Sequence, residues 1–395
     1  MLNSVSHDAR VVKEADALAA AGYEVLVVGL QDDRCTERES RRPSGVRIVR
    51  IDHGWRGRTD QAASGSSVLH RAGTFLRRAM AYRATRRLMC DEAERFGATV
   101  VHCHDLTTLP IGVRWRRRAA GRTLVFDSHE LYEESAGMSR TMQRVWRRVL
   151  RTNAPFVDGF ITINDSIADE HARRYPALAR AVVVMNAAEL PASPPSDDGR
   201  LRRAAGLGPT DRILLYQGGY SRHRGLEELV RGAAGLPAGW SLVMMGWGSI
   251  EGELRRIADV ESPGKVRFVP PAPQSELCDW SAGASLGVIP YENTCLNHWY
   301  CTPNKLWEYP SSGVPLLVSP FPELRRAVES GDMGRTLPQP LEPASLGALV
   351  ASIDDDELRR MREACRRFVE REHWGVYAER LVGAYRRWVG SPRRS

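Results

Sequence analysis

The chain has 395 residues, of which 43% are hydrophobic and 26% charged, a composition typical of a globular protein and not of a disordered or fibrous one. No segment approaches the ~18 consecutive apolar residues of a membrane span, and the first residues form neither a signal peptide nor a lipidation motif. We therefore expect a cytoplasmic protein, and its length predicts two domains.

The formal net charge of +8 arises entirely in the first half of the chain. Residues 1–185 contain 30 Lys and Arg against 22 Asp and Glu, whereas residues 186–395 contain 26 of each. Interspersed apolar residues make the arginine clusters typical of basic amphipathic helices, which suit a peripheral contact with the anionic inner face of the cell membrane. A solvated helix face is the simpler alternative, and no nucleic-acid partner is expected because no nucleic-acid module is recognisable. The clusters comprise Arg77, Arg78, Arg83, Arg86, Arg87, Arg114, Arg116, Arg117, Arg118, Arg144, Arg147, Arg148 and Arg151.

Helical and strand-like patterns alternate along the first half. The predicted helices cover residues 8–21, 68–96, 108–119 and 138–153 and begin again at 165, and the predicted strands cover residues 23–29, 47–51, 99–104, 123–127, 159–163 and 181–185. This alternation predicts a parallel sheet covered by helices on both faces. Such a unit normally opens with a strand, yet only Met1–Val5 precede the first helix. We expect either a very short first strand or, preferably, a start that lies further upstream.

A linker rich in Pro and Ser is predicted over residues 186–211, after which the alternation restarts. The predicted strands cover residues 212–216, 240–245, 266–269, 286–289 and 314–318, and the predicted helices 225–234, 249–258, 274–282, 355–371 and 377–389. We therefore predict an α/β fold of two doubly wound, Rossmann-like domains, residues 1–185 and 212–372, facing each other across a cleft. Folds of this kind bind ligands at the carboxyl ends of their strands.

The segment from Thr302 to Gly313 predicts a further helix, with Thr302 as N-cap and Pro303 as its first residue. Its first turn offers free N–H groups and the positive end of the helix dipole, and Lys305 adds a full charge. Glu308 lies three residues on and shares that face. A cation that attracts phosphate, beside a carboxylate that accepts hydroxyl hydrogens, suits a sugar attached to a nucleoside diphosphate.

Two segments containing glycine are predicted to join a strand to the helix that follows it. In Gly218–Gly225 the glycines let the backbone approach a ligand, and Arg224 can clamp a phosphate. Gly246–Gly248 is weaker evidence, because a tight turn explains it as well. Neither segment is a dinucleotide-binding G-x-G-x-x-G or a Walker loop. A surface turn with exposed arginines is the alternative for the first segment.

The segment Asp127–Glu130 follows a strand, so His129 is expected at the strand edge that faces the cleft, where a histidine can orient or deprotonate a hydroxyl. A structural histidine in a loop is the alternative. We predict no metal site, because neither His102–Asp105 nor the group Cys295, His298 and Cys301 has enough further ligands. The seven cysteines are scattered without a C-x-x-C pair, which predicts free thiols.

With these residues in place, the whole chain resembles the retaining GT-B glycosyltransferases, most closely the family 4-like enzymes (glycosyl transferases group 1). The segment His7–Gly29 is similar to their opening helix and second strand, and Asp127–Glu130 to their histidine loop. Val184–Asn186 is similar to the entry of their linker between domains. Gly218–Gly225 resembles the G-R-x-x-x-x-K-G loop, and Pro303–Gly313 the P-N-K-L-F-E-Y-x-x-x-G form of the donor signature.

The resemblance implies roles for particular residues. Arg224 and Lys305 would hold the donor diphosphate, Glu308 the ribose hydroxyls, and His129 the acceptor or the sugar. The segment 373–395 would form a helix that crosses back to the first domain. Two positions depart from the family pattern: Gly219 stands in place of an arginine that Arg222 can replace, and Tyr300 in place of the first Glu of an E-x7-E pair. The expected donor contacts are Gly218, Gly219, Arg222, Arg224, Gly246, Trp247, Gly248, Asn304, Lys305 and Glu308.

We therefore expect a retaining glycosyltransferase that uses neither a metal nor a cofactor. Its donor is expected to be a nucleotide-sugar, a UDP-sugar in the first place, and its acceptor a hydroxyl compound of a class that the sequence leaves open. One alternative is a sugar-nucleotide 2-epimerase, which has a similar fold and would convert the donor with no acceptor present. Another is a non-catalytic partner that binds the donor without turnover, which the residue Tyr300 would favour.

Overall fold

The structure is a computed structural model that describes residues 1–5, 8–33, 35–52, 68–191, 193 and 195–390, with the side chains of residues 68–79 left aside. His7 of the opening motif, two residues of the predicted linker, and the side chains of Arg77 and Arg78 lie outside this description. The chain forms two compact units. Unit 1 comprises Met1–Glu133, Met138–Val184 and Ala378–Ser395, and unit 2 comprises Glu134–Gly137 and Met185–Tyr377. Among the described residues, no helix is both long and apolar enough to cross a membrane.

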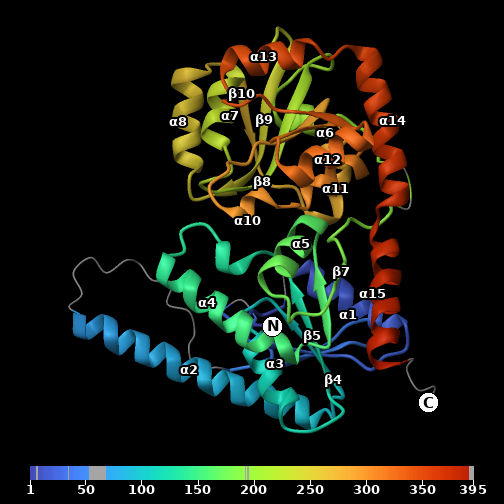
Figure 1. Ribbon diagram of the computed structural model, residues 1–395. Helices are drawn as coiled ribbons and strands as arrows, with labels where there is room; N and C mark the ends of the chain where they lie inside the picture. Colours follow the sequence, from blue (N-terminus) through green and yellow to red (C-terminus); the bar gives the residue numbers. More distant parts are fainter. Residues whose placement is uncertain (6–7, 34, 53–67, 192, 194, 391–395) are drawn as a thin grey trace. The chain divides into compact units, whose positions relative to one another are not determined.

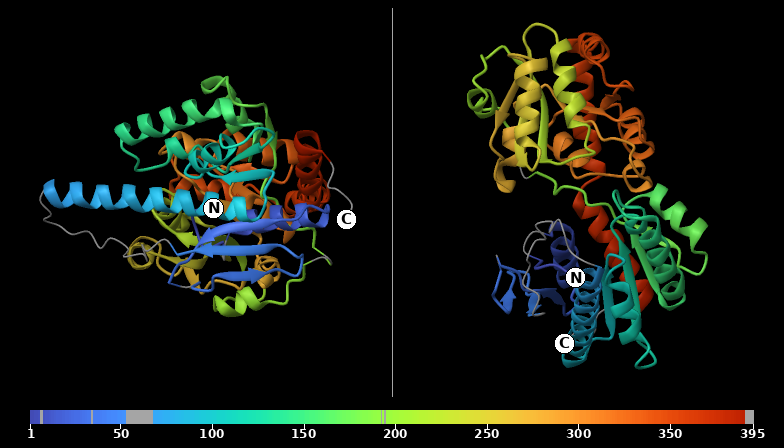
Figure 2. Two further views of the ribbon diagram at one scale, coloured as in Figure 1. Left: turned by 90° about the horizontal axis from the view of Figure 1, so that it is seen from below. Right: turned by 90° about the vertical axis from the view of Figure 1, so that its left-hand side faces the viewer.

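Unit 1 contains two sheets instead of the one that was predicted (Figure 1). The first has the strand order β1-β3-β2, shown side by side in Figure 2, and the second is the parallel sheet β4-β5-β6-β7. The elements are α1 (Ala9–Ala20), β1 (Leu26–Leu30), β2 (Glu39–Arg41), β3 (Arg47–Ile51), α2 (Val68–Arg95), β4 (Val100–His104), α3 (Leu109–Arg116), β5 (Thr123–Ser128), α4 (Arg140–Asn153), β6 (Gly159–Thr162), α5 (Asp165–Arg174) and β7 (Ala181–Val183). The antiparallel strand β2 is an element that the sequence did not predict.

The segment before α1 lies along β1 without forming a regular strand. The Met1 ammonium donates to the Val28 carbonyl at 2.9 Å, and the Leu30 amide donates to the Asn3 carbonyl at 2.8 Å. These two contacts hold the segment beside β1, although none of its residues is assigned to a strand. Leu2 packs into a core cluster shared by β1, β3, β4, α2 and α3, so the two sheets have a common interior although no strand among the described residues joins them.

Unit 2 is built on one six-stranded parallel sheet of order β10-β9-β8-β11-β12-β13. Its strands are mostly buried, as expected where helices cover both faces, with α7 and α8 on one side and α11, α12 and α14 on the other (Figure 1). The elements are α6 (Arg200–Ala204), β8 (Arg212–Tyr220), α7 (Leu226–Gly232), β9 (Trp240–Gly248), α8 (Glu251–Glu261), β10 (Val266–Val269), α9 (Leu277–Ser281), β11 (Leu286–Ile289), α10 (Leu296–Trp299), α11 (Lys305–Ser311), β12 (Leu316–Val318), α12 (Pro322–Gly331), β13 (Gly334–Thr336), α13 (Pro343–Ala351) and α14 (Asp355–Arg371).

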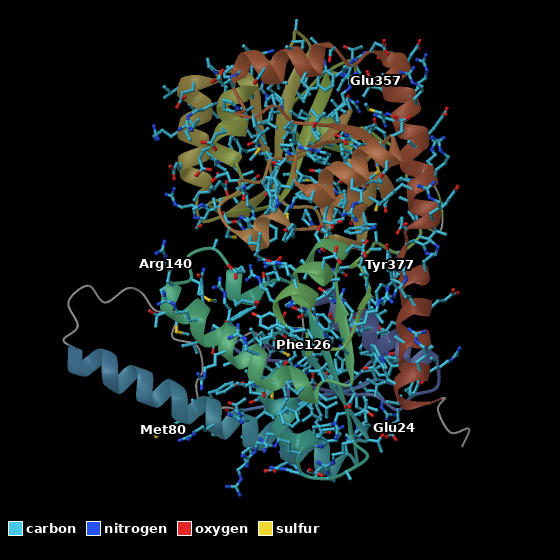
Figure 3. The ribbon with its side chains drawn as sticks, viewed as in Figure 1. Glu24, Met80, Phe126, Arg140, Glu357 and Tyr377 are labelled. Atoms are coloured by element: carbon cyan, nitrogen blue, oxygen red, sulfur yellow. The ribbon has the colours of Figure 1, made fainter. Side chains whose placement is uncertain are left out.

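The last helix, α15 (Trp374–Val389), begins in unit 2 and continues into unit 1. Within unit 1, the Trp388 ring lies so close to Gly159 of β6 that a Cβ at that glycine would meet it at 2.6 Å. The Tyr385 hydroxyl hydrogen bonds to Nδ1 of His102 on β4 at 2.7 Å. The interior of the same unit holds Phe126 on β5, labelled in Figure 3 and stacked on Phe160. The helix α15 thus packs against the sheet that also carries the histidine loop.

Candidate functional site

The helix predicted to bind the donor is α11, and it begins at Lys305, two residues later than predicted. Its N-cap position is Asn304, so the prediction of Thr302 as N-cap is wrong. The physical reason is a tight turn ahead of the helix, in which the Leu306 amide donates to the Pro303 carbonyl. Gly313 ends the helix with φ of 68°, as predicted for a residue in the left-handed region.

Lys305 carries its charge into the interior of unit 2. Its side chain is 7% exposed, and its Nζ lies 5.3 Å from the centre of the Tyr216 ring and 5.9 Å from that of Tyr291. A Cβ added to Gly218 would stand 3.0 Å from this Nζ, closer than ordinary van der Waals contact, and the φ of 117° at Gly218 also favours glycine. Burial lowers the pKa of Lys305. No carboxylate of the described residues forms a salt bridge with it.

Arg224 reaches the same aromatic pair. Its Nη1 donates to the Tyr291 hydroxyl at 2.8 Å, and its guanidinium carbon lies 5.3 Å from the centre of that ring. Two cations therefore share the Tyr291 ring, and neither forms a salt bridge with a carboxylate among the described residues. Such a pair attracts an anion of more than one charge, because each cation raises the electrostatic potential at the other.

Glu308 is held in place by a chain of buried hydrogen bonds. Its Oε2 accepts from Gln217 Nε2 at 2.9 Å, and the Gln217 Oε1 accepts from the Ser281 hydroxyl at 2.6 Å. The backbone N–H of Gln217 also donates to the Tyr309 hydroxyl. This arrangement fixes one carboxylate oxygen and leaves Oε1 without a hydrogen-bond partner among the described residues. A fixed carboxylate with one unused acceptor oxygen suits a ligand hydroxyl.

The glycines Gly218, Gly219, Gly246 and Gly248 lie in the ends of strands and not in turns. β8 continues through Tyr220 and β9 through Gly248, and their last residues pair as Gly218 with Gly246 and Gly219 with Trp247. The prediction ended both strands early because glycine usually ends a strand. Here glycine is required for close packing: a Cβ at Gly246 would lie 2.0 Å from the Gly218 carbonyl oxygen. The Trp247 side chain is exposed beside this pair.

The turn that does lead into a helix comes after β8, from Ser221 to Gly225. The Gly225 amide, at the start of α7, donates to Glu292 Oε1 at 3.1 Å, so a carboxylate of the protein already occupies the helix terminus that was expected to receive an anion. Arg222 is exposed and pairs with Glu253 at 3.0 Å and Glu227 at 3.7 Å. Unlike Lys305 and Arg224, Arg222 therefore already has carboxylate partners. Asn304 lies beside that pair in sequence, and its side-chain oxygen accepts from Asn186.

The His129 loop of unit 1 forms a second, separate group of charged side chains. The His129 Nε2 lies 3.0 Å from Asp127 Oδ2, and its Nδ1 lies 3.4 Å from Asp105 Oδ1. Burial alone would lower the pKa of His129, but Asp127 and then Asp105 outweigh it and raise this pKa to about 9. The imidazole is thus a cation near neutral pH, and this charge state suits electrostatic positioning rather than removal of a proton from a hydroxyl.

Residues that the sequence did not single out hold Asp127 in turn. Arg10 of α1 makes a two-pronged contact with both oxygens of Asp127 at 2.9 Å and pairs with Glu14 at 3.0 Å. Burial alone would raise the pKa of Asp127, but Arg10 and then His129 outweigh it and hold this pKa well below its ordinary value. His104 lies 3.1 Å from His129 Nε2, and burial lowers its pKa to about 4. A neutral His104 can therefore accept from the His129 cation.

The ligand atoms of Glu14, His102, His104 and Asp127 lie within 4.8 Å of one another, a spacing that a metal ion could bridge. The Arg10 guanidinium already contacts both carboxylates, however. A second cation in the same group would be repelled by it.

Comparisons with known proteins identify relatives of this chain. Residues 8–187 match the family described as "Glycosyl transferase 4-like domain". The chain is 29% identical over 227 residues to a D-inositol 3-phosphate glycosyltransferase of Thermobispora bispora, covering 52% of this chain and 50% of that protein. It is 27% identical over 207 residues to D-inositol 3-phosphate glycosyltransferase 1 of Catenulispora acidiphila, covering 49% of this chain and 48% of that protein. The chain spans about half the length of these curated relatives.

Solved structures agree over nearly the whole chain. Sucrose-phosphate synthase from Thermosynechococcus elongatus superposes with a TM-score of 0.74 at 19% identity, covering 97% of this chain and 93% of that one. HepE of Anabaena in complex with UDP gives a TM-score of 0.67 at 15% identity, covering 97% of each chain. The fold is therefore GT-B, with two Rossmann-like domains. The resemblance to family 4-like GT-B glycosyltransferases is confirmed, and the 2-epimerase alternative is not favoured, since the matching family and the curated relatives are named as glycosyltransferases.

Proposed function

We propose that the protein transfers a sugar from a nucleoside-diphosphate-sugar, with UDP as the expected nucleotide, to an acceptor hydroxyl with retention of the anomeric configuration. The observation that carries the proposal is the pair of cations without carboxylate partners, Lys305 and Arg224, which share the Tyr291 ring beside Gly218. The HepE protein was solved with UDP and with UDP-glucose, which supports the same donor class here.

In this proposal the donor diphosphate lies against the two cations. Negative charge builds up on the leaving oxygen as the bond to the sugar breaks, and preorganised positive groups stabilise that charge without reorganising during the reaction. Glu308, fixed through Gln217, accepts from the ribose hydroxyls. Because Lys305 and Arg224 supply positive charge, we propose that transfer does not depend on a metal ion, which activity in the presence of EDTA will test.

On the side of unit 1, we propose that the His129 cation positions the acceptor or the transferring sugar by donating hydrogen bonds. The acceptor stays defined only as a hydroxyl compound. Because the curated relatives are named for D-inositol 3-phosphate, that compound belongs in the first panel of acceptors, beside a polyisoprenoid lipid and a polysaccharide end. The basic helices of unit 1 further support a proposed peripheral contact with an anionic membrane.

The experiment begins with the melting temperature in the presence of UDP, GDP, ADP and TDP, because a ligand that binds only the folded state raises it. The nucleotide that gives the largest shift defines the sugar donors for transfer assays, and NMR of the product reports its anomeric configuration.

We expect Lys305→Ala and Arg224→Ala to lower turnover by ~10²-fold or more. Arg256→Ala, on the exposed face of α8, is the matched control and should leave turnover unchanged. Full turnover in both site variants would show that these cations take no part in catalysis. A product with inverted anomeric configuration would contradict the proposed retention.

A further inference from the structure

A groove lined by arginines lies on unit 1. The volume of the groove is about 610 Å³, and its lining comes from α2, α3 and the end of α4. Of these helices, α3 packs against both α2 and α4 (Figure 1). Pro110, Val113, Arg114 and Arg117 are spaced at i, i+3, i+4 and i+7, so they form one face of α3. The lining consists of Arg86, Pro110, Val113, Arg114, Arg117, Arg118 and Asn153.

The charges of this groove are largely uncompensated. Arg118 pairs with Glu94 at 3.4 Å and Asp91 at 3.7 Å. Among the described residues, Arg86, Arg114 and Arg117 have no carboxylate partner, and no acidic side chain belongs to the lining. The Nε of Arg86 is buried without a hydrogen-bond partner, and its guanidinium carbon lies 5.7 Å from the centre of the Tyr82 ring.

Further contacts orient the lining. The guanidinium of Arg117 lies over the Phe156 ring at 5.3 Å. Arginines placed on aromatic rings keep their N–H groups free for another acceptor, and the planar guanidinium matches the oxygens of a phosphate. Asn153 adds an amide, whose Nδ2 is already engaged by the Val149 carbonyl. The lining thus offers at least three cations and two apolar side chains to one anionic ligand.

The groove does not belong to the His129 site. α3 starts at the carboxyl edge of the sheet, where Thr108 N bonds to the Asp105 carbonyl, and runs back to the opposite edge. There Arg116 pairs with Asp158, which directly precedes β6. At ~1.5 Å of rise per residue, Arg117 lies on the order of 10 Å further along the helix axis than its first turn. A ligand held by Arg114 and Arg117 is therefore separate from the chemistry proposed at His129.

We propose that this groove is a binding site for a phosphate-bearing ligand, held by Arg86, Arg114 and Arg117 and distinct from the His129 loop of the same unit. The phosphate comes either from a soluble compound or from a lipid headgroup, and the two sources share the same recognition. The proposal does not depend on the proposed activity, because none of these arginines belongs to the donor or acceptor side.

The test uses inorganic pyrophosphate, titrated calorimetrically at low salt into the full-length Arg224→Gln/Lys305→Gln protein, in which the candidate donor site no longer competes. We expect binding that weakens at higher salt. The further changes Arg86→Gln, Arg114→Gln and Arg117→Gln together should weaken it by at least ~10-fold, since hydrogen bonds to charged groups are the strongest of their kind. Arg114→Gln alone, at an exposed helix position, should weaken it by roughly 3-fold and serves if the triple variant does not fold.

The matched control is Arg144→Gln/Arg148→Gln/Arg151→Gln on α4, which removes the same charge from exposed positions outside the groove and should retain binding. Equal weakening in both triple variants, or no pyrophosphate binding at all, would overturn the proposal. A second arm sediments the proteins with phosphatidylcholine vesicles containing phosphatidylglycerol. Loss of vesicle binding in the groove variant alone would identify a lipid headgroup as the source, and loss of pyrophosphate binding without any vesicle effect would identify a soluble phosphate.

Discussion

At the scale of single residues, Lys305 combines a cost in stability with a proposed gain in binding. A buried ammonium without a carboxylate partner destabilises the folded state. We expect Lys305→Met, which keeps most of the volume, to raise the free energy of unfolding of the ligand-free protein by roughly 1 kcal/mol or more. The same change should abolish the rise in melting temperature caused by UDP. Urea unfolding with and without UDP measures both effects.

Lys265→Met is the control for this prediction and should have the opposite sign. The Lys265 ammonium donates to the carbonyl oxygens of Leu236 and Pro237 at 2.8 and 3.0 Å, so its removal leaves two acceptors without their donor. A loss of stability in Lys305→Met, with the UDP shift intact, would show that Lys305 is a structural cation and not a ligand-binding one.

The raised pKa of His129 leads us to expect that the free energy of unfolding depends on pH. Its pKa is about 9 in the folded protein and 6.5 in its ordinary state. A base whose pKa is raised by folding stabilises the fold fully below 6.5 and loses that contribution as the pH rises to about 9. This rise in pKa corresponds to roughly 3 kcal/mol. The difference in unfolding free energy between the wild type and His129→Asn should therefore shrink by about that amount across this interval, and a constant difference would contradict the assignment.

The sequence predicts which charged residues belong to the candidate donor site, but not the residues that contact them and fix their positions. Lys305 and Glu308 follow from helical spacing, and Arg224 from its place after a strand. Tyr291, which contacts both cations, and Gln217, which fixes Glu308, belong to other strands and loops. Such contacts between residues far apart in sequence leave no local pattern. The polar residue Gln217, directly after a predicted strand and before two glycines, is a signal that could have been used.

At the scale of elements, the paired ends of β8 and β9 depend on glycine. Gly246→Ala would bring a Cβ to 2.0 Å from the Gly218 carbonyl oxygen, and a backbone atom cannot move aside as a flexible side chain can. We expect a loss of stability of about 1–3 kcal/mol. Affinity for UDP should fall as well, because Gly218 adjoins the Lys305 ammonium. Denaturant unfolding and the UDP shift provide the two measurements.

Gly252→Ala is the matched control, because it lies in α8 with no atom within 4 Å of an added Cβ. Alanine favours helix over glycine, so this variant should gain up to ~1 kcal/mol. If Gly246→Ala were equally harmless, the close approach of the two strands would have no energetic consequence. The same glycines explain why both strands were predicted too short: glycine also ends strands, and only the pairing partner distinguishes the two uses.

At the scale of the whole molecule, the alternation of helices and strands was sufficient to predict two Rossmann-like domains. The alternation did not predict that unit 1 would contain two sheets. Residues 1–5 lie beside β1, and so short a segment shows no strand pattern from which its pairing could be predicted. Nor does a local pattern reveal that α15 passes from unit 2 into unit 1, where Tyr385 contacts His102. That contact joins positions 283 residues apart in the sequence.

This division leads to a prediction for the isolated second unit. Residues 185–377 contain the complete six-stranded sheet, its core, and the side chains of Lys305, Arg224 and Glu308. Expressed alone, this fragment should unfold cooperatively, since its interior is formed by its own strands and helices. It should also retain a UDP-induced rise in melting temperature that Lys305→Met removes. A folded fragment with no response to UDP would mean that the proposed donor site requires residues of unit 1, because the cations alone would then be insufficient to hold the diphosphate.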